Sequence, residues 1–481
     1  MSAGQAARVP ASSTSPGGVW APERRALTVG LVLAVTLVAF EALAIATILP
    51  VVSRHLGDLR LYGWVFSAFM LSSLVGIVLA GTLADRVPLG RPMLAGLALF
   101  ALGLAVGGFA PDMPVLVADR AVQGLGAGVV PAVAYVAISR GYPEGCRPRM
   151  FAVLSTAWVI PGLIGPAVAA LVATAVGWRW VFLGLLPLVA AAGVLVIPAL
   201  KHVPARAGAT GPAGGTGPAG GTGPSQHARV PYLPVLGVVA GAALALIAVS
   251  SGNLPAVVSG VIAGGILLAV SLRRLTPPRT LTAGRGLPAT ILSRGLLTCC
   301  FFAGDAYVPY AITAVRHAPT GLAALALTMT TMTWTAGSWV QARCIARCGP
   351  RRLVRCGEGL VAGGLALMCV VLMPSVPPAF SVLAWTVAGA GMGLAYAPLS
   401  VTALDRAPAG EEGRVTSGLQ LCDVLGQALG TGLAGAIVAA AGPDHRAGVA
   451  LAFVAAIGVS VTALAAGSRL PGGLSGQDRG F

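Results

Sequence analysis

The residues of this sequence that could do chemistry are a few charged side chains inside apolar stretches. Glu41 lies in the middle of the first apolar run, nine residues before Pro50, and Asp305 lies well inside a run in the second half of the chain. Arg120 interrupts a third run. A charged group at the centre of a membrane helix costs roughly 2.5–3.5 kcal/mol, so it normally faces a cavity or a partner. A carboxylate that can exist both neutral and charged is what a proton carrier requires.

Glu41 and Asp305 occupy similar places in two similar halves of the chain. An offset of 261 residues sets Asp305 opposite position 44, one helical turn from Glu41. The counterpart of Arg120 is Trp385, so the positive charge is not duplicated, and an arginine cannot give up its proton. We therefore expect Glu41 to carry the proton, Arg120 to hold a neighbouring carboxylate charged, and Asp305 to contribute to cation recognition.

Other charged residues in the apolar runs leave alternatives open. Arg120 could instead form a purely structural pair with Asp119 or Glu41. Asp119 is expected to be solvated near a membrane surface, and Glu358 to be a local counter-ion at an arginine-rich helix end. Asp423, about two turns into its apolar run, is a candidate for a substrate cavity.

The composition indicates what the elements around these charges must be. Of 481 residues, 56% are hydrophobic and 10% are charged, whereas soluble domains are about 25% charged. This excludes a water-soluble globular protein, a disordered chain and a nucleic-acid-binding domain. A spanning helix needs roughly 20 apolar residues, so the sequence predicts an all-α polytopic membrane protein whose surroundings are the lipid bilayer.

Apolar runs predict about 14 spans in a 6 + 2 + 6 arrangement. The GPAGGT repeat that follows the first six spans indicates a flexible linker. In chain order we expect a cytoplasmic tail (1–26), a six-helix bundle (27–200), a Gly/Pro-rich cytoplasmic linker (201–231), an extra transmembrane hairpin (232–272), a cytoplasmic loop (273–287), a second six-helix bundle (288–467) and a cytoplasmic tail (468–481).

Arginine placement predicts the orientation of these spans. The segments on the side of the amino end carry about 24 Lys and Arg residues, and the opposite loops carry 5. Because positive residues concentrate on the cytoplasmic side, we expect both termini in the cytoplasm and the protein in the cell membrane. No Ser/His/Asp set, metal-spaced cluster or phosphate-cradling loop is present in the sequence, so we expect neither an enzyme nor a metal or other cofactor.

An internal repeat relates the two predicted bundles. GLGAG at 124–128 matches GAGMG at 389–393 at an offset of 265, and Gly165 matches Gly430 at the same offset. A shared offset of this kind indicates a duplicated transporter fold.

Three motifs in order resemble those of the major facilitator superfamily. GTLADRVPLGR at 81–91 resembles motif A, DRAVQGLGAG at 119–128 resembles motif B, and PGLIGP at 161–166 resembles motif C, the antiporter signature. GWRWVFLGLLPLV at 177–189 is similar to a segment of 14-span drug:proton antiporters. The residues that carry these motifs are Gly81, Asp85, Arg86, Gly90 and Arg91 (motif A), Arg120, Gln123, Gly124 and Gly126 (motif B), and Gly162, Gly165 and Pro166 (motif C).

The resemblance implies two six-helix bundles that rock around a central site and open it alternately to each side. It places Asp85 as a latch against the cytoplasmic start of span eleven, counted over the twelve spans of the two bundles. It also implicates Arg120 in proton coupling and lets span five bend at motif C. Glu41 replaces the aspartate usual in this family, and motif A has three residues between Arg86 and Gly90 where one is usual.

These features favour a proton-coupled exporter of amphipathic, cationic or neutral drug-like compounds that is driven by the proton gradient. The resemblance implies that it works as a monomer. Two alternatives stay open: export of a neutral lipid or a self-made metabolite, and a transport-dead receptor-like or assembly protein. Aromatic rings and a carboxylate suit lipophilic cations. The cavity candidates are Trp64, Tyr135, Trp158, Tyr307, Tyr310, Trp334 and Asp423.

Overall fold

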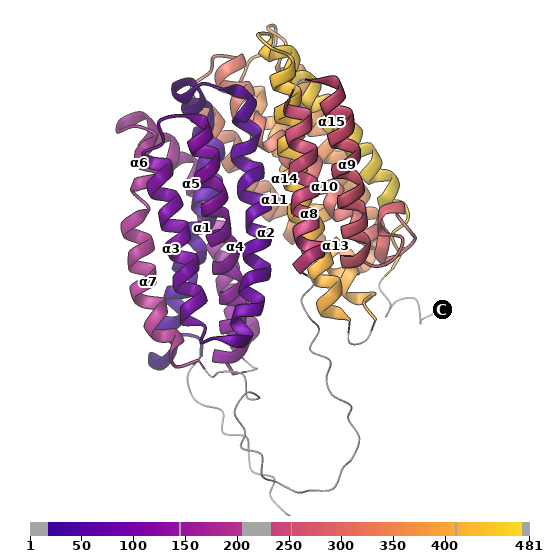
Figure 1. Cartoon of the computed structure of the whole chain (residues 1–481). Coiled ribbons are helices and arrows are strands. Elements are labelled where there is room, and N and C mark those ends of the chain that lie inside the picture. The colour runs from indigo at the N-terminus through magenta and orange to yellow at the C-terminus, as the bar shows by residue number, and fades with distance from the viewer. Residues whose placement is uncertain (1–17, 144–145, 204–231, 252, 409–410, 474–481) are drawn as a thin grey trace, which may run out of the picture.

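The computed structural model describes residues 18–143, 146–203, 232–251, 253–408 and 411–473, and all regular elements there are helices (Figure 1). Most of the predicted linker and the outer parts of both tails lie outside the described residues. The long helices are α1 (Pro22–Leu56), α2 (Tyr62–Arg86), α3 (Gly90–Gly108), α4 (Met113–Gly141), α5 (Arg147–Ala175), α6 (Arg179–Leu183) continued by α7 (Leu186–Leu200), α8 (Tyr232–Ser250), α9 (Leu254–Leu275), α10 (Leu287–Tyr310), α11 (Thr320–Cys348), α12 (Pro350–Val371), α13 (Phe380–Asp405), α14 (Glu412–Ala440) and α15 (His445–Gly467).

Thirteen helical segments of the described residues are long and apolar enough to span a membrane, taking α6 and α7 together. The remaining long helix, α11, has 29 residues but contains many threonines. Their hydroxyls bond to carbonyls one turn earlier, as Thr330 does to Ala326 at 2.8 Å. Because such bonds satisfy the hydroxyls within the helix, α11 can lie beside the other spans despite its lower hydropathy. The chain therefore has the fourteen-helix, multi-pass membrane architecture that the sequence predicts.

The helices form two bundles, α1–α7 and α10–α15 (Figure 1). The bundles meet where α2 packs on α14 and where α5 packs on α11. The hairpin of α8 and α9 lies at one flank of this seam, and α8 contacts both α2 and α14. Trp64 of α2 donates a hydrogen bond to Ser250 of α8 at 3.2 Å.

Glycines that match in the internal repeat allow α4 and α13 to pack closely against the other helices of their bundles. A Cβ at Gly124 would collide with Phe69 of α2, and a Cβ at the equivalent Gly389 would collide with Thr330 of α11. Gly126 and Gly391 face the neighbours on the other side, α3 and α12. Small residues let membrane helices approach closely, so the offset of 265 residues in the sequence corresponds to the same packing in both bundles.

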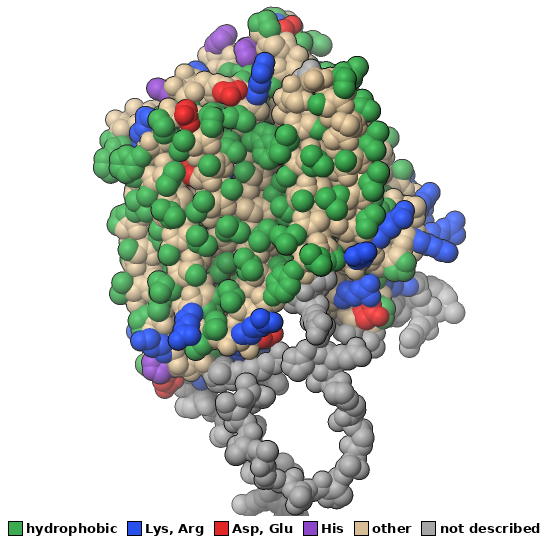
Figure 2. All heavy atoms as spheres, viewed as in Figure 1, with side chains coloured by type: hydrophobic (Ala, Val, Ile, Leu, Met, Phe, Trp, Pro, Cys, Tyr) green, Lys and Arg blue, Asp and Glu red, His purple; other side chains and the backbone are tan. Residues whose placement is uncertain are grey.

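Charged side chains are distributed unequally between the two ends of the molecule. Arginines concentrate at the turns α2–α3, α4–α5, α9–α10 and α11–α12, and we call the end that holds these turns the arginine-rich end. In Figure 2 most visible Lys and Arg side chains lie toward the lower end and the lower right flank. Hydrophobic side chains cover most of the surface above them. The opposite, arginine-poor end holds the turns α1–α2, α3–α4, α10–α11 and α14–α15.

Candidate functional site

A buried ion pair joins α1 and α4 near the middle of the first bundle. The Arg120 Nη1 group donates to both Glu41 Oε1 and the side-chain oxygen of Gln123, and its Nε donates to the carbonyl of Val65 at 3.2 Å. The guanidinium also lies over the Phe69 ring, 4.1 Å from its centre. Arg120 and Glu41 are 1% and 2% exposed. The pair thus holds together α1, α2 and α4.

The second oxygen of Glu41 has a different environment from the first. Glu41 Oε2 is buried and forms no hydrogen bond with any described residue. An ionised carboxylate accepts hydrogen bonds only, whereas the protonated acid is also a donor. Glu41 therefore has one oxygen committed to Arg120 and one that can carry a proton without first breaking another bond.

Asp119, next to Arg120, is not solvated as expected but 2% exposed. A Cβ added at Gly107 of α3 would strike its carboxylate, and neither oxygen has a hydrogen-bond partner among the described residues. Consecutive residues of a helix point about 100° apart, so Asp119 turns toward α3 while Arg120 faces α1. Glu358 is also fully buried, between α12 and α15, and its oxygens have no hydrogen-bond partner within the described part of the chain.

The repeat places a related pair in the second bundle. Trp385 Nε1 of α13 donates to Asp305 Oδ1 of α10 at 2.8 Å, and Phe301 stacks on Trp385 with ring centres 5.3 Å apart. Trp385 corresponds to Arg120 in the first bundle, and Asp305 corresponds to position 44, one helical turn from Glu41. In the first bundle α4 holds the Glu41 carboxylate by an ion pair. In the second bundle the equivalent helix, α13, holds the Asp305 carboxylate by a neutral N–H donor.

A second buried ion pair, which the sequence analysis missed, joins Arg294 of α10 to Asp423 of α14, and Arg294 also bonds to α13. Arg294 Nε donates to Asp423 Oδ1 at 2.9 Å, and its Nη1 donates to the Tyr396 carbonyl and Ser400 Oγ at 2.7 and 3.1 Å. The Tyr396 hydroxyl donates to Asp423 Oδ2 at 3.0 Å. Asp423 is therefore fully bonded. The signal for Arg294 was its place within an apolar run seven residues after Leu287.

The aromatic residues that the sequence predicts for the cavity lie in three different surroundings, and the third of these is the contact between the bundles. Tyr135 and Trp158 are 45% and 47% exposed, and Trp334 packs edge-on against Tyr396. Trp64 instead lies against the α8 hairpin, because the face of α2 that carries it turns toward that helix and away from α1 and α4. We do not retain Trp64 as a cavity residue.

Tyr307 and Tyr310 belong to the contact between the bundles. Both rings pack on Tyr62 of α2, with centres 5.0 and 5.3 Å away, and Tyr307 is fully buried. A Cβ at Gly63 would lie 2.7 Å from the Thr431 carbonyl and 3.2 Å from the Tyr307 hydroxyl. At this level the arginine-poor ends of α2, α10 and α14 are therefore in close contact.

The motif A residues occupy the arginine-rich end. Asp85 Oδ1 accepts from Arg140 Nη2 of α4 at 2.8 Å, within its own bundle, and Arg86 and Arg91 are exposed. A Cβ at Gly81 would meet nothing within 4 Å, and at Gly90 its nearest neighbour would be 3.7 Å away. The contact of Asp85 with the start of α14 stays a prediction.

The motif C residues lie in a continuous α5 that contains Pro161 and Pro166. A Cβ at Gly162 would collide with Thr331 of α11, so this glycine lets the two bundles touch. A Cβ at Gly165 would make only ordinary contact with Phe40 at 3.6 Å. Among the residues that the structure describes, no group of three or more His, Cys, Asp or Glu side chains could hold a metal ion.

Comparisons with known proteins agree with this architecture. Residues 31–342 match the family model described as Major Facilitator Superfamily. The chain is 30% identical over 429 residues to a probable multidrug-efflux transporter of Mycobacterium tuberculosis, covering 86% of this chain and 88% of that protein. It is 28% identical over 156 residues to multidrug resistance protein 3 of Bacillus subtilis, covering 32% of this chain and 30% of that protein.

Solved structures show the same fold at low identity. The POT family transporter PepTSo superposes with a TM-score of 0.67 at 15% identity, covering 92% of this chain and 97% of that one. A D-xylose-proton symporter superposes with a TM-score of 0.62 at 14% identity, covering 93% and 98%.

Proposed function

This chain belongs to the major facilitator superfamily, a family of transporters and not of enzymes, and from this premise we propose that it exports amphipathic drug-like compounds in exchange for protons. We place it with the 14-span drug:proton antiporters, because it has fourteen long helices, the motifs A, B and C in order, and relatives named for multidrug efflux. The compounds would be cations or neutral molecules.

The observation that carries the proposal is the buried pair of Glu41 and Arg120. Arginine stays charged, so the proton must reside on Glu41. When Glu41 is charged, it holds Arg120 by a charge-assisted bond and fixes α1 to α4. When it takes a proton, the ionic part of this attraction is lost, and Arg120 keeps Gln123, the Val65 carbonyl and the Phe69 ring. Protonation would thereby loosen α1.

The inter-bundle contacts support a site that is closed at the arginine-poor end. Ser67 of α2 bonds to Thr431 and to the Ala428 carbonyl of α14, beside the packed Tyr62, Tyr307 and Tyr310. With the arginine-rich end in the cytoplasm, as the positive residues favour, this arrangement would receive substrate from the cytoplasmic side. Rocking of the bundles would then release the substrate outside and expose Glu41 to protons there.

Proton-coupled transport can be tested in vesicles holding the purified protein with an imposed pH gradient. Internal pH is followed while lipophilic cations and neutral antibiotics are added. We expect wild type to move protons when a transported compound is added, and Glu41→Gln to lower this flux at least tenfold. The matched control is Glu358→Gln, which makes the same change at a fully buried acid that has no link to Arg120.

Two further results would alter the proposal. If Glu41→Gln leaves the proton flux unchanged and Asp305→Asn abolishes it, the proton carrier is Asp305 of the second bundle and not Glu41. A response to lipids or metabolites and to no drug-like compound would replace the proposed substrate class with the alternative one. Glu41→Asp, which keeps the carboxylate, should retain part of the flux and separates loss of charge from loss of folding.

A further inference from the structure

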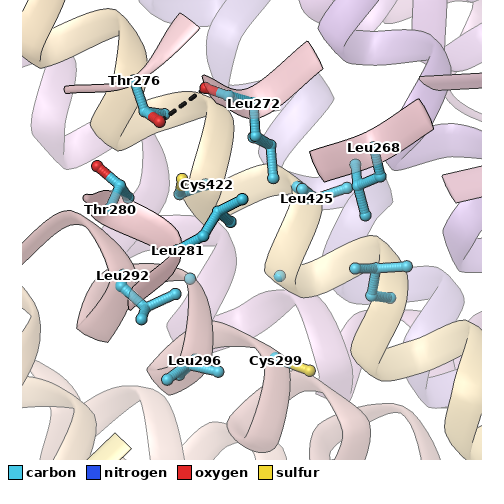
Figure 3. A pocket seen from close by; sticks show the side chains of 13 residues that line it. Leu268, Leu272, Thr276, Thr280, Leu281, Leu292, Leu296, Cys299, Cys422 and Leu425 are labelled. Carbon is cyan, nitrogen blue, oxygen red and sulfur yellow. Dashed lines mark hydrogen bonds between the residues drawn. The ribbon is translucent and has the colours of Figure 1, made fainter. Parts of the chain in front are cut away.

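An apolar cleft of about 160 Å³ opens on the flank of the molecule between α9, α10 and α14 (Figure 3). Figure 3 shows side chains from all three helices pointing into it. Its walls are mainly leucines: Leu268 and Leu272 of α9, Leu292 and Leu296 of α10, and Leu425 and Leu429 of α14. Leu292 and Leu296 are only half-buried, so the cleft is open to the surroundings.

The surroundings of this cleft are hydrocarbon. Only 11% of the apolar stretch of α9 is buried within the protein, so most of this helix faces the membrane. An apolar cavity of about 150 Å³ is large enough for a benzene-sized hydrocarbon. The cleft therefore accepts a segment of one acyl chain, and its position away from Glu41 and Arg120 keeps it outside the site proposed for proton coupling.

Positively charged side chains lie near one end of the cleft. Thr276 and Thr280 line it at the arginine-rich end, where α9 ends. Arg273, Arg274 and Arg279 are exposed beside these two threonines, and residues 270–290 contain no acidic side chain. Basic residues at the end of an intramembrane groove attract anionic head groups.

We propose that this cleft binds an anionic phospholipid from the leaflet at the arginine-rich end. One acyl chain lies between α9, α10 and α14, and the phosphate group rests on Arg273, Arg274 and Arg279. The hairpin supplies one wall of the cleft together with Arg273 and Arg274, and the connection that follows α9 supplies Arg279, which gives α9 a binding role that the two bundles alone would lack.

The test uses the full-length protein in phosphatidylcholine vesicles that contain a small fraction of photoactivatable lipid. The same diazirine-bearing chain is placed on phosphatidylglycerol or on phosphatidylcholine, and cross-linked peptides are identified by mass spectrometry. We expect cross-links in the segments 292–299 and 422–429, at least about fivefold stronger with phosphatidylglycerol. Each arginine near an anionic group contributes about fivefold, so Arg273→Gln with Arg274→Gln and Arg279→Gln should remove this preference.

Two variants separate the cleft from general lipid contact. Leu296→Trp fills the cleft and should abolish the cross-links to α14. Ile266→Trp adds the same bulk at a position of α9 where the native residue is 60% exposed, and it should leave these cross-links unchanged. Equal labelling by the two lipids would overturn the anionic specificity, and unchanged labelling in a folded Leu296→Trp variant would overturn the site. Displacement of the label by a transported cation, and not by phosphatidylglycerol, would assign the cleft to substrate instead.

Discussion

The two buried arginines hold their carboxylates in different ways. Glu41 leaves one oxygen without a hydrogen bond to any described residue, whereas both oxygens of Asp423 are bonded, to Arg294 and to the Tyr396 hydroxyl. A fully satisfied pair rigidifies the helices that carry it. We therefore assign Arg294 and Asp423 a structural role in joining α10, α13 and α14, and reserve proton exchange for Glu41.

This assignment predicts that Asp423→Asn lowers stability strongly. Removing one partner of a buried ion pair costs about 3–5 kcal/mol, because the other charge stays buried. We expect a clear drop of Tm in detergent, partly recovered when Arg294→Gln is added. The control is Glu411→Gln, since Glu411 and Arg414 form a half-exposed pair at 3.6 Å and such pairs contribute about 0–1 kcal/mol. Equal Tm values for the two single variants would contradict the assignment.

The sequence predicted the Glu41 side of the site better than the Asp423 side. Trp385 is the repeat counterpart of Arg120, and Asp305 lies one helical turn from the counterpart of Glu41, so the duplication seen in the sequence also gives each bundle one carboxylate held by the equivalent helix. Arg294 corresponds to Leu33 at the offset of 261 residues that relates Asp305 to the first half, so the repeat could not indicate its partner. Asp119 was misplaced because its depth along α4 was considered without the direction of its side chain.

At the scale of elements, the glycines of α4 and α13 are needed for close packing. A Cβ at Gly391 would lie 2.5 Å from the Gly357 carbonyl and 2.9 Å from the Val361 amide of α12. By contrast, a Cβ at Gly363 of α12 would meet nothing within 4 Å. The sequence indicated the first kind of glycine only through its repeat, since composition does not tell a packed glycine from an exposed one.

We predict that Gly391→Ala destabilises the protein and that Gly363→Ala does not. Overpacking a tight contact costs about 1–3 kcal/mol, whereas alanine at an open helical position favours the helix by up to about 1 kcal/mol. Thermal unfolding of both variants in the same detergent measures the difference. A Gly391→Ala variant as stable as wild type would mean that α12 and α13 separate easily, contrary to the packing in the structure.

The hairpin is the element whose place the sequence could not predict. Its two apolar runs indicated helices between the bundles along the chain, and α8 and α9 follow them closely. Its contacts with α2 and α14 depend on side chains such as Trp64, whose aromatic type had suggested the cavity instead. An aromatic residue in a membrane helix serves a cavity and a helix contact equally well, so only the three-dimensional arrangement distinguishes them.

At the scale of the whole molecule, the two bundles are packed together at the arginine-poor end through α2 and α14. Gly63 is central to this contact, because the Thr431 carbonyl and Gly435 lie against it with no space for a side chain. Alternating access requires this contact to open while the opposite end closes. A side chain at position 63 would penalise the arrangement seen here and leave the opposite one unaffected.

We therefore predict that Gly63→Leu shifts the protein toward the state open at the arginine-poor end. A steric penalty of about 1–3 kcal/mol on one state changes the ratio of the two states about 5- to 150-fold. Spin labels at the exposed positions Arg60 and Asp444, in an active cysteine-depleted background, would report the change as longer distances between the bundles. Gly363→Leu, on α12, where an added side chain meets nothing within 4 Å, should leave the distances unchanged. If both variants give the wild-type distribution, the packing at Gly63 does not control the balance between the two states, and the barrier to opening lies in the contact of α5 with α11.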